Sequence, residues 1–96
     1  MANFTVRVEL HQAEWADYDQ LHAAMEQKGF SRRITSDDDG RTYQMPWAEY
    51  NGTGTVNSTQ VRDIAKTAAD STGKQNAVFV TEAVSHAWIG LPVAKN

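Results

Sequence analysis

Residues 3–11 read NFTVRVELH, and the strict alternation within them decides the fold. Four apolar residues alternate with four polar ones along this stretch: Phe4, Val6, Val8 and Leu10 with Thr5, Arg7, Glu9 and His11. A repeat of two is typical of a β-strand that buries one face and exposes the other. The sequence therefore predicts a first strand over residues 3–11, with its apolar row in the core.

Two helices are predicted where apolar residues recur at spacings of three and four. The first spans residues 14–28 and ends at Gly29, which suits a left-handed cap. Its predicted buried stripe consists of Trp15, Tyr18, Leu21, Ala24 and Met25. The second begins after Asn57 or Ser58, which are good N-caps, and continues to Gly73. Its predicted stripe consists of Val61, Ile64, Ala65 and Ala68.

A hairpin is predicted between the two helices. Residues 30–36 alternate, and residues 37–40, Asp-Asp-Asp-Gly, supply turn chemistry before a second arm over residues 41–50. One alternating row of that arm contains Tyr43, Met45 and Trp47. Pro46 cannot donate a ladder hydrogen bond, so it must face an edge or a bulge. Residues 77–84 are apolar on both parities, which predicts a last strand that is buried on both sides or covered by a partner chain.

The order strand, helix, strand, strand, helix, strand within 96 residues predicts an α+β, ferredoxin-like fold. In this fold a four-stranded antiparallel sheet carries both helices on one face and leaves the other face open. One domain is expected over residues 1–96, because a second core would need about 50 further residues. Its core covers residues 3–84. The extension over residues 85–96 is either a short extra strand or a segment that docks on a neighbouring molecule.

Composition narrows the classes of partner. Nine Lys plus Arg against twelve Asp plus Glu give a net charge of -3 and a pI near 5.5, which argues against non-specific binding of duplex DNA. The absence of cysteine excludes disulfides and thiolate zinc sites. The longest apolar run, residues 77–80, is too short to span a bilayer, and the N-terminus lacks the pattern of a signal peptide. We expect a cytoplasmic protein with no membrane partner and no cofactor.

Three side chains have the chemistry for metal-independent cleavage of RNA: Glu9, His11 and Arg33. The first strand is central in the predicted topology, so Glu9 and His11 lie on the open face, and Arg33 joins them from the hairpin. A carboxylate and an imidazole can act as base and acid, while a guanidinium stabilises the developing phosphorane charge. The same polar row also fits an ordinary solvated face.

Neither a metal site nor a role for His22 is predicted. The acids at residues 37–39 are consecutive, whereas a calcium loop places its ligands on alternate positions. The three histidines, His11, His22 and His86, lack the spacing of a helical zinc motif. We expect His22 on the surface of the first helix.

Four further residues are candidates for binding RNA: Arg7, Arg32, Tyr43 and Gln44. Arginine side chains pair with phosphates, amides such as Gln44 bind nucleotide edges or phosphates, and exposed aromatic rings stack on unpaired bases. Tyr43 and Trp47 have a second interpretation, because the same row packs beneath the helices if the register turns it inward.

The chain resembles the GhoS family of small ferredoxin-like bacterial proteins over residues 3–84. The resemblance is carried by four features: the spacing of Leu21 and Met25, the pair Phe30-Ser31, the turn Asp38-Asp39-Gly40, and the pair Gln44-Met45. Proteins of this family are endoribonuclease antitoxins of type V toxin–antitoxin systems. The resemblance therefore implies a bacterial antitoxin that binds single-stranded messenger RNA and cleaves it.

The alternative hypothesis is a non-catalytic, dimeric ferredoxin-like binding module of prophage or mobile-element origin. Its motivation is the net negative charge and the doubly apolar strand over residues 77–84, which suits pairing across a two-fold axis. A homodimer would then form through this strand and the C-terminal extension, and the module would act through protein–protein or ligand contacts.

Overall fold

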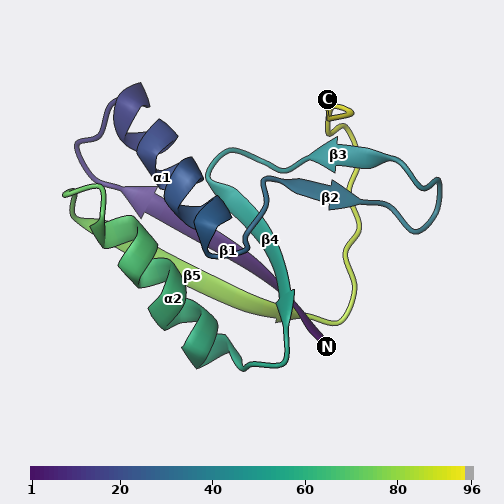
Figure 1. Ribbon diagram of the computed structural model, residues 1–96. Coiled ribbons are helices and arrows are strands. Elements are labelled where there is room, and N and C mark those ends of the chain that lie inside the picture. The colour runs from purple at the N-terminus through teal and green to yellow at the C-terminus, as the bar shows by residue number, and fades with distance from the viewer. Residues whose placement is uncertain (95–96) are drawn as a thin grey trace.

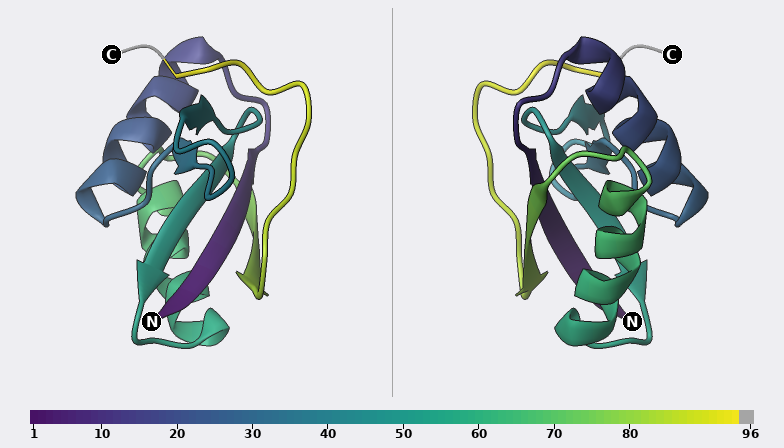
Figure 2. Two further views of the ribbon diagram at one scale, coloured as in Figure 1. Left: turned by 90° about the vertical axis from the view of Figure 1, so that its right-hand side faces the viewer. Right: turned by 90° about the vertical axis from the view of Figure 1, so that its left-hand side faces the viewer.

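The computed structural model describes residues 1–94, which form a three-stranded sheet, a separate two-stranded sheet and two helices (Figure 1). In chain order the elements are β1 (Ala2–Leu10), α1 (Trp15–Gln27), β2 (Arg33–Thr35), β3 (Thr42–Gln44), β4 (Glu49–Gly54), α2 (Ser58–Asp70) and β5 (Asn76–Ala83). The three-stranded sheet has the order β4-β1-β5 and is antiparallel throughout. Both helices cover the same face of this sheet (Figure 2). The other face, called the open face below, carries no helix, and the C-terminal segment passes along it on the side of Thr5. The prediction of an α+β fold is thus confirmed.

The alternation along β1 is confirmed residue by residue. Its apolar row, Phe4, Val6, Val8 and Leu10, is buried beneath the helices. Arg7 and Glu9, from the other row, are exposed on the open face. Because β1 pairs with both β4 and β5, it is the central strand, as predicted. The polar row therefore runs along the middle of the open face.

The helix ends follow the predicted capping chemistry. At the start of α2, the Asn57 carboxamide oxygen accepts from the Gln60 N–H at 2.9 Å, and Oε1 of Gln60 accepts from the Asn57 N–H at 2.9 Å. This reciprocal pair is a capping box. After α1, Gly29 has φ +91°, the left-handed conformation that glycine adopts without steric cost.

Three side chains of the helices differ in burial from the prediction. Trp15 is 74% exposed and Ile64 is exposed, although both repeat at helical spacing. His22, predicted on the surface, is only 6% exposed. The reason is that α1 turns the face containing Leu21, His22 and Met25 towards the core, so Trp15 at the first turn extends beyond the edge of that core.

The predicted four-stranded sheet is wrong, because the chain after α1 leaves the sheet at once. Only the antiparallel bridge between Ser31 and Asn51 joins it to β4. The next carbonyl, Arg32 O, accepts from the Met45 N–H at 2.7 Å, so the chain pairs with its own hairpin arm instead. The two strands β2 and β3 form a sheet of their own, which projects away from the main sheet (Figure 1).

The predicted hairpin arm over residues 41–50 is interrupted at Pro46, which has no N–H for a ladder bond. Pro46 O accepts from the Glu49 N–H at 3.1 Å, closing a turn in which Ala48 has φ +60°. This turn separates β3 from β4. The row of Tyr43, Met45 and Trp47, for which two orientations were open, does not share one environment: Met45 is buried, Trp47 is 51% exposed and Tyr43 is half-buried outside the main core.

The last strand, β5, is not buried on both sides within this chain. It is an outer strand whose only pairing partner among residues 1–94 is β1. Val78 and Val80 pack against the core, whereas Phe79 is 70% exposed. The apolar residues of the second row therefore face solvent on the open side of the sheet.

The C-terminal extension folds back onto its own chain and pairs with β3. The Gln44 N–H donates to Pro92 O at 2.8 Å, and the Ala94 N–H donates to Thr42 O at 2.9 Å. Figure 2 shows this segment running past the open side of the sheet to reach the hairpin. The predicted extra strand is thus a short bridge centred on Val93, and residues 95–96 of the predicted extension lie outside the described residues.

We expect Gly52→Ala to destabilise the fold by about 1–3 kcal/mol, because an added methyl group would overpack the core. A Cβ atom at Gly52 would lie 2.6 Å from Cδ1 and 2.8 Å from Cε1 of the buried Phe30 ring. Gly54 is the matched control on the same strand, since its Cβ would meet only Val56 Cγ2 at 3.4 Å. Urea denaturation of both variants tests this. Equal stability of the two would show that the Phe30 ring moves aside freely.

Candidate functional site

The open face of the sheet is organised by the strand register. Arg7 lies between Glu49 on β4 and Phe79 on β5, because it pairs with both. Directly opposite residues of an antiparallel pair share one face, with Cβ atoms about 4.5–5.5 Å apart. Glu9 lies two positions further along the same face, opposite Ala77. A cation, an aromatic ring and two carboxylates therefore lie next to one another on an open sheet.

The side chains at the centre of this face are accessible. The side chain of Arg7 is 59% exposed, and its Nη1 lies 3.8 Å from Oε2 of Glu49. A loose pair at the surface contributes at most about 1 kcal/mol, so Glu49 does not hold the guanidinium strongly. Phe79 presents an exposed ring beside it. This ring is 70% exposed.

The structure separates the three predicted catalytic residues. Glu9 and His11 are exposed at the end of β1, and the backbone N–H of His11 donates to Gln75 O at 2.8 Å. Arg33, on β2, instead lines a groove together with Asn3 at the start of β1. Asn51, which pairs with Thr5, lines the same groove, so Arg33 lies towards the N-terminal half of β1, whereas His11 follows its C-terminal end. Arg7 is thus the arginine that lies with Glu9 and His11.

The groove that contains Arg33 lies between the β2–β3 hairpin and the C-terminal segment, and has a volume of about 690 Å³. Tyr43 donates its hydroxyl hydrogen bond to Oδ2 of Asp39 at 2.5 Å, and its ring lies 5.6 Å from that of Trp88. This hydrogen bond lowers the pKa of Asp39 and raises the pKa of Tyr43. Nε2 of His86, another lining residue, lies 2.8 Å from Oγ1 of Thr5.

The other two predicted RNA-binding residues support the hairpin. The amide of Gln44 donates from Nε2 to Arg32 O at 3.0 Å, so it stabilises the turn away from the sheet. Arg32 is half-buried, and its Nε has no hydrogen-bond partner among the described residues. Its positive charge acts on the buried groups His22 and Tyr50. Neither residue lies on the open face.

A buried polar pair lies beneath the helices. Nδ1 of His22 is 2.7 Å from the hydroxyl oxygen of Tyr50, and Nε2 of the same ring has no partner in the described part of the chain. Burial is the main cause that lowers the pKa of His22, and the charge of Arg32 adds to it. Burial also raises the pKa of Tyr50. Both groups are therefore neutral at physiological pH.

We expect the stability of the fold to decrease as the pH falls below about 6.5, the usual pKa of an unfolded histidine. His22 in the unfolded chain binds a proton in the window between 6.5 and the lowered folded pKa, whereas the folded chain does not. The free energy of unfolding is thus fully retained above this window and declines within it, by at most about 1.4 kcal/mol per pH unit. Urea denaturation at several pH values measures this slope.

The matched controls for this pH effect are His22→Leu and His86→Ala. The first variant has no titrating group at the buried position, so its slope in this window should be smaller than that of the wild-type protein. The second removes a histidine outside the core, so the slope of this variant shows how much of the pH effect does not come from the buried position. An equal slope in the wild-type protein and His22→Leu would contradict the prediction.

Sequence analysis did not identify the exposed position of Phe79 or the buried position of His22, although the sequence contains a pattern that indicates each. Phe79 shares a parity with Ala77 and Thr81, which becomes the open-face row once β5 pairs with β1. His22 follows Tyr18 by four positions and precedes Met25 by three, so the helical repeat itself includes it.

Comparison with known proteins found no matching family model and no similar curated protein. Within residues 1–94, no group of three or more histidine, aspartate or glutamate side chains is placed to hold a metal ion. No helix in the same range has the length and apolar character needed to cross a membrane.

Proposed function

We propose that the protein is an endoribonuclease that binds single-stranded RNA across its open sheet face and cleaves it without a metal ion. The observation that carries this proposal is the exposed Phe79 ring beside Arg7 at the centre of the face. Aromatic rings on an open antiparallel sheet stack on unpaired bases, and arginine contributes phosphate and cation–π contacts. The resemblance to the GhoS family supports the same substrate and an antitoxin role in the bacterial cytoplasm.

The proposed chemistry uses Glu9 and His11, with Arg7 in the role first given to Arg33. One of the two acid–base groups removes the proton of the ribose 2′-hydroxyl, and O2′ then attacks the adjacent phosphorus. The bond from phosphorus to O5′ breaks, and the other group donates a proton to O5′. Arg7 stabilises the negative charge that develops on the phosphorane oxygens. The products carry a 2′,3′-cyclic phosphate and a 5′-hydroxyl group.

The decisive experiment is incubation of the protein with an end-labelled, unstructured RNA in EDTA, followed by a denaturing gel and analysis of the product ends. Cleavage with cyclic phosphate ends is expected, and a perfect RNA duplex should remain intact because its bases cannot reach Phe79. A DNA oligonucleotide of the same sequence should bind but not be cleaved, since it lacks the 2′-hydroxyl. An intact single-stranded RNA at high protein excess would refute the proposal.

We expect Phe79→Ala to weaken the binding of single-stranded RNA by about 1–3 kcal/mol, or roughly 5- to 150-fold, because one stacking contact is lost. Fluorescence anisotropy with a labelled oligonucleotide measures this loss. The matched control is Ile64→Ala, which removes an exposed apolar side chain from α2 on the covered face. An equal effect of both variants would show that the open face has no special role in binding.

The outer edge of β5 favours a second candidate, the non-catalytic dimeric module. This edge pairs with no other strand among the described residues, and an unpaired edge is a template for a second copy. Pairing of β5 with β5 across a two-fold axis would join two open faces into a continuous sheet. Light scattering combined with size exclusion tests for the dimer, and a dimer that leaves RNA intact would favour this function over the first.

A further inference from the structure

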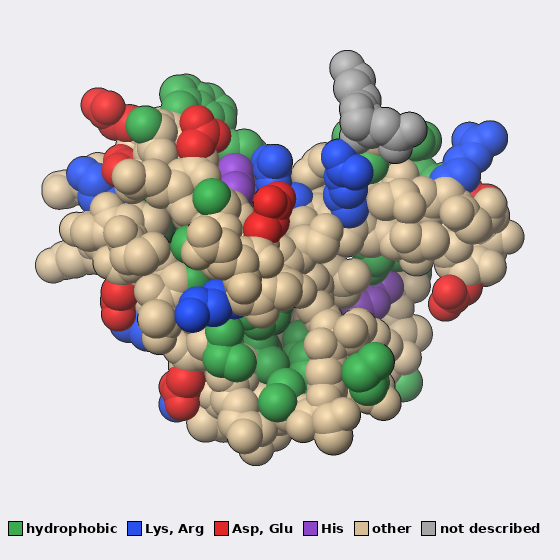
Figure 3. All heavy atoms as spheres, in the orientation of Figure 1, with side chains coloured by type: hydrophobic (Ala, Val, Ile, Leu, Met, Phe, Trp, Pro, Cys, Tyr) green, Lys and Arg blue, Asp and Glu red, His purple; other side chains and the backbone are tan. Residues whose placement is uncertain are grey.

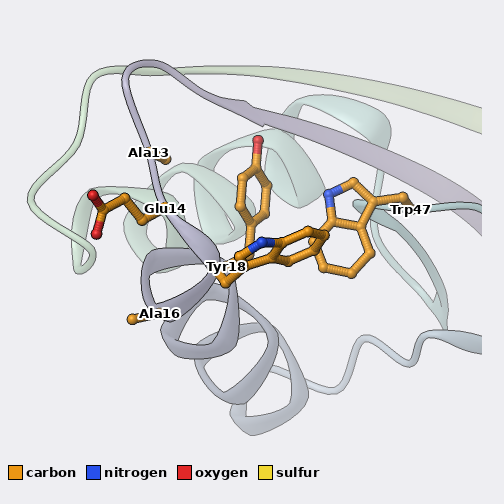
Figure 4. Close-up of a pocket in the computed structure, with 6 residues that line it drawn as sticks. Ala13, Glu14, Ala16, Tyr18 and Trp47 are labelled. Carbon is orange, nitrogen blue, oxygen red and sulfur yellow. The ribbon is translucent and has the colours of Figure 1, made fainter.

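A hollow of about 560 Å³ lies at the start of α1, away from the open face (Figure 4). Its lining residues are Ala13, Glu14, Trp15, Ala16, Tyr18 and Trp47, none of which belongs to the three-stranded sheet. This volume lies within the range of about 300–1,000 Å³ that is common for small-molecule sites. None of the residues proposed to bind or cleave RNA lines this hollow.

The aromatic rings of the hollow meet at steep angles. The ring centroids of Trp15 and Trp47 are 5.1 Å apart with planes at 76°, and those of Tyr18 and Trp47 are 5.3 Å apart at 53°. Rings arranged in this way form adjoining walls of a corner. A cation placed in the corner lies within about 6 Å of more than one ring, the range in which cation–π attraction operates.

The ring of Trp47 also packs against a buried side chain. The His22 ring lies 5.2 Å from that of Trp47 at 86°, and His22 is itself held by Tyr50. Trp47 precedes Ala48, which has φ +60° in the turn closed by Pro46 and Glu49. Such a conformation persists only where the surroundings enforce it. The backbone at Trp47 is thus fixed by this turn, and its ring packs against those of Trp15, Tyr18 and His22.

The charge around the hollow is negative. Glu14 lines it, and Asp17 follows in the first turn of α1, where its Oδ2 accepts from the Glu14 N–H at 2.9 Å and lies 3.8 Å from Nζ of Lys74. The two carboxylates exceed the single charge of Lys74 together with the positive half-charge of the helix N-terminus. Figure 3 shows hydrophobic atoms gathered near this end of α1, with acidic side chains on both sides of them. An anionic ligand is therefore disfavoured here, and a cationic one is favoured.

We propose that this hollow binds a small organic cation of the quaternary ammonium class. Ring faces recognise such a group by its charge and its apolar methyl surface, as aromatic cages do. The Glu14 carboxylate points away from the rings in Figure 4, so it attracts a cation to the hollow without contacting the rings. A nucleobase fits less well, because the rings meet at angles and do not form two parallel walls. The ligand is bound independently of RNA.

The test compares choline with 3,3-dimethylbutan-1-ol, which has the same shape without the charge. The chain has three tryptophans, so their indole N–H signals in a nitrogen–proton NMR spectrum report on each ring separately. Choline should shift the signals of Trp15 and Trp47 and leave that of Trp88 in place. The neutral analogue should bind at least tenfold more weakly. Equal binding of both compounds, or no shift with millimolar choline, would overturn the proposal.

Two variants locate the site. Trp15→Ala should abolish the choline-induced shift of Trp47 and leave signals remote from the hollow, such as that of Trp88, unchanged, since Trp15 is exposed and outside the core. Glu14→Gln should weaken choline binding severalfold, whereas the matched control Glu82→Gln, on β5, should not. Retained binding in Trp15→Ala, or tighter binding of a nucleoside monophosphate than of choline at this site, would also overturn the proposal.

Discussion

Glu9→Gln and His11→Ala are each expected to lower the rate of RNA cleavage by about 10²- to 10⁴-fold, the usual contribution of a general acid or base. Gln keeps the size of Glu9 and loses its ability to exchange a proton. Alanine at position 11 removes the imidazole altogether. Single-turnover kinetics with an end-labelled oligonucleotide in EDTA measure the chemical step directly, without interference from product release.

The controls for this experiment are folding stability, RNA affinity and a histidine variant outside the proposed catalytic pair. Both residues are exposed, so neither variant should change the free energy of unfolding by more than about 0.5 kcal/mol. RNA affinity should be retained, because Arg7 and Phe79 remain. His86→Ala removes another exposed histidine, from the groove beside the hairpin, and should cleave at the wild-type rate. Loss of activity only in His86→Ala would move the chemistry from the open face to that groove.

The covered half of the fold follows from short-range patterns. The alternation from Phe4 to Leu10 defines the central strand, because a period of two leaves only one way to bury four apolar side chains. Gly29 and the Asn57–Gln60 capping box mark helix boundaries through backbone chemistry that neighbouring residues determine. These signals do not depend on which strands later pair.

The departure of the hairpin from the sheet depends on long-range competition and was not predictable from alternation. Residues 30–36 alternate equally well as a sheet strand or as a hairpin arm. The turn at Pro46 distinguishes the two outcomes. It separates β3 from β4, and Met45, on the β3 side of the turn, pairs with Arg32. Pro46 in the sequence indicated that the strand is interrupted. It did not indicate that the interruption is a turn with φ +60° at Ala48, after which the chain enters a different sheet.

The candidate site was predicted as far as β1 determines it. Arg7 and Glu9 are placed by the parity of one strand, so the sequence alone puts them on the open face. Arg33 was placed on this face by extending the same parity to a four-stranded sheet, whereas its strand, β2, belongs to the two-stranded sheet. Phe79 was hidden for a different reason, since β5 is apolar in both rows and its parity selects a face only after pairing with β1.

Tyr50→Ala is expected to destabilise the fold by about 3–5 kcal/mol, the usual cost of removing a buried aromatic ring. Tyr50 has no exposed surface and is the largest fully buried side chain of the core. A domain of this size has a total stability of about 5–14 kcal/mol, so this single change removes a large share of it. Urea denaturation followed by circular dichroism should show a much lower midpoint with a similar slope.

Tyr50→Phe separates the ring from its hydroxyl group. The phenyl ring keeps the packing, but Nδ1 of His22 loses its partner at 2.7 Å, which leaves a buried polar atom unsatisfied at a cost of about 1–3 kcal/mol. Adding His22→Leu removes that atom as well, so the double variant should recover part of the loss. If Tyr50→Phe alone costs less than about 0.5 kcal/mol, the hydrogen bond contributes nothing in solution. The inner support of the Trp47 ring would then be packing alone.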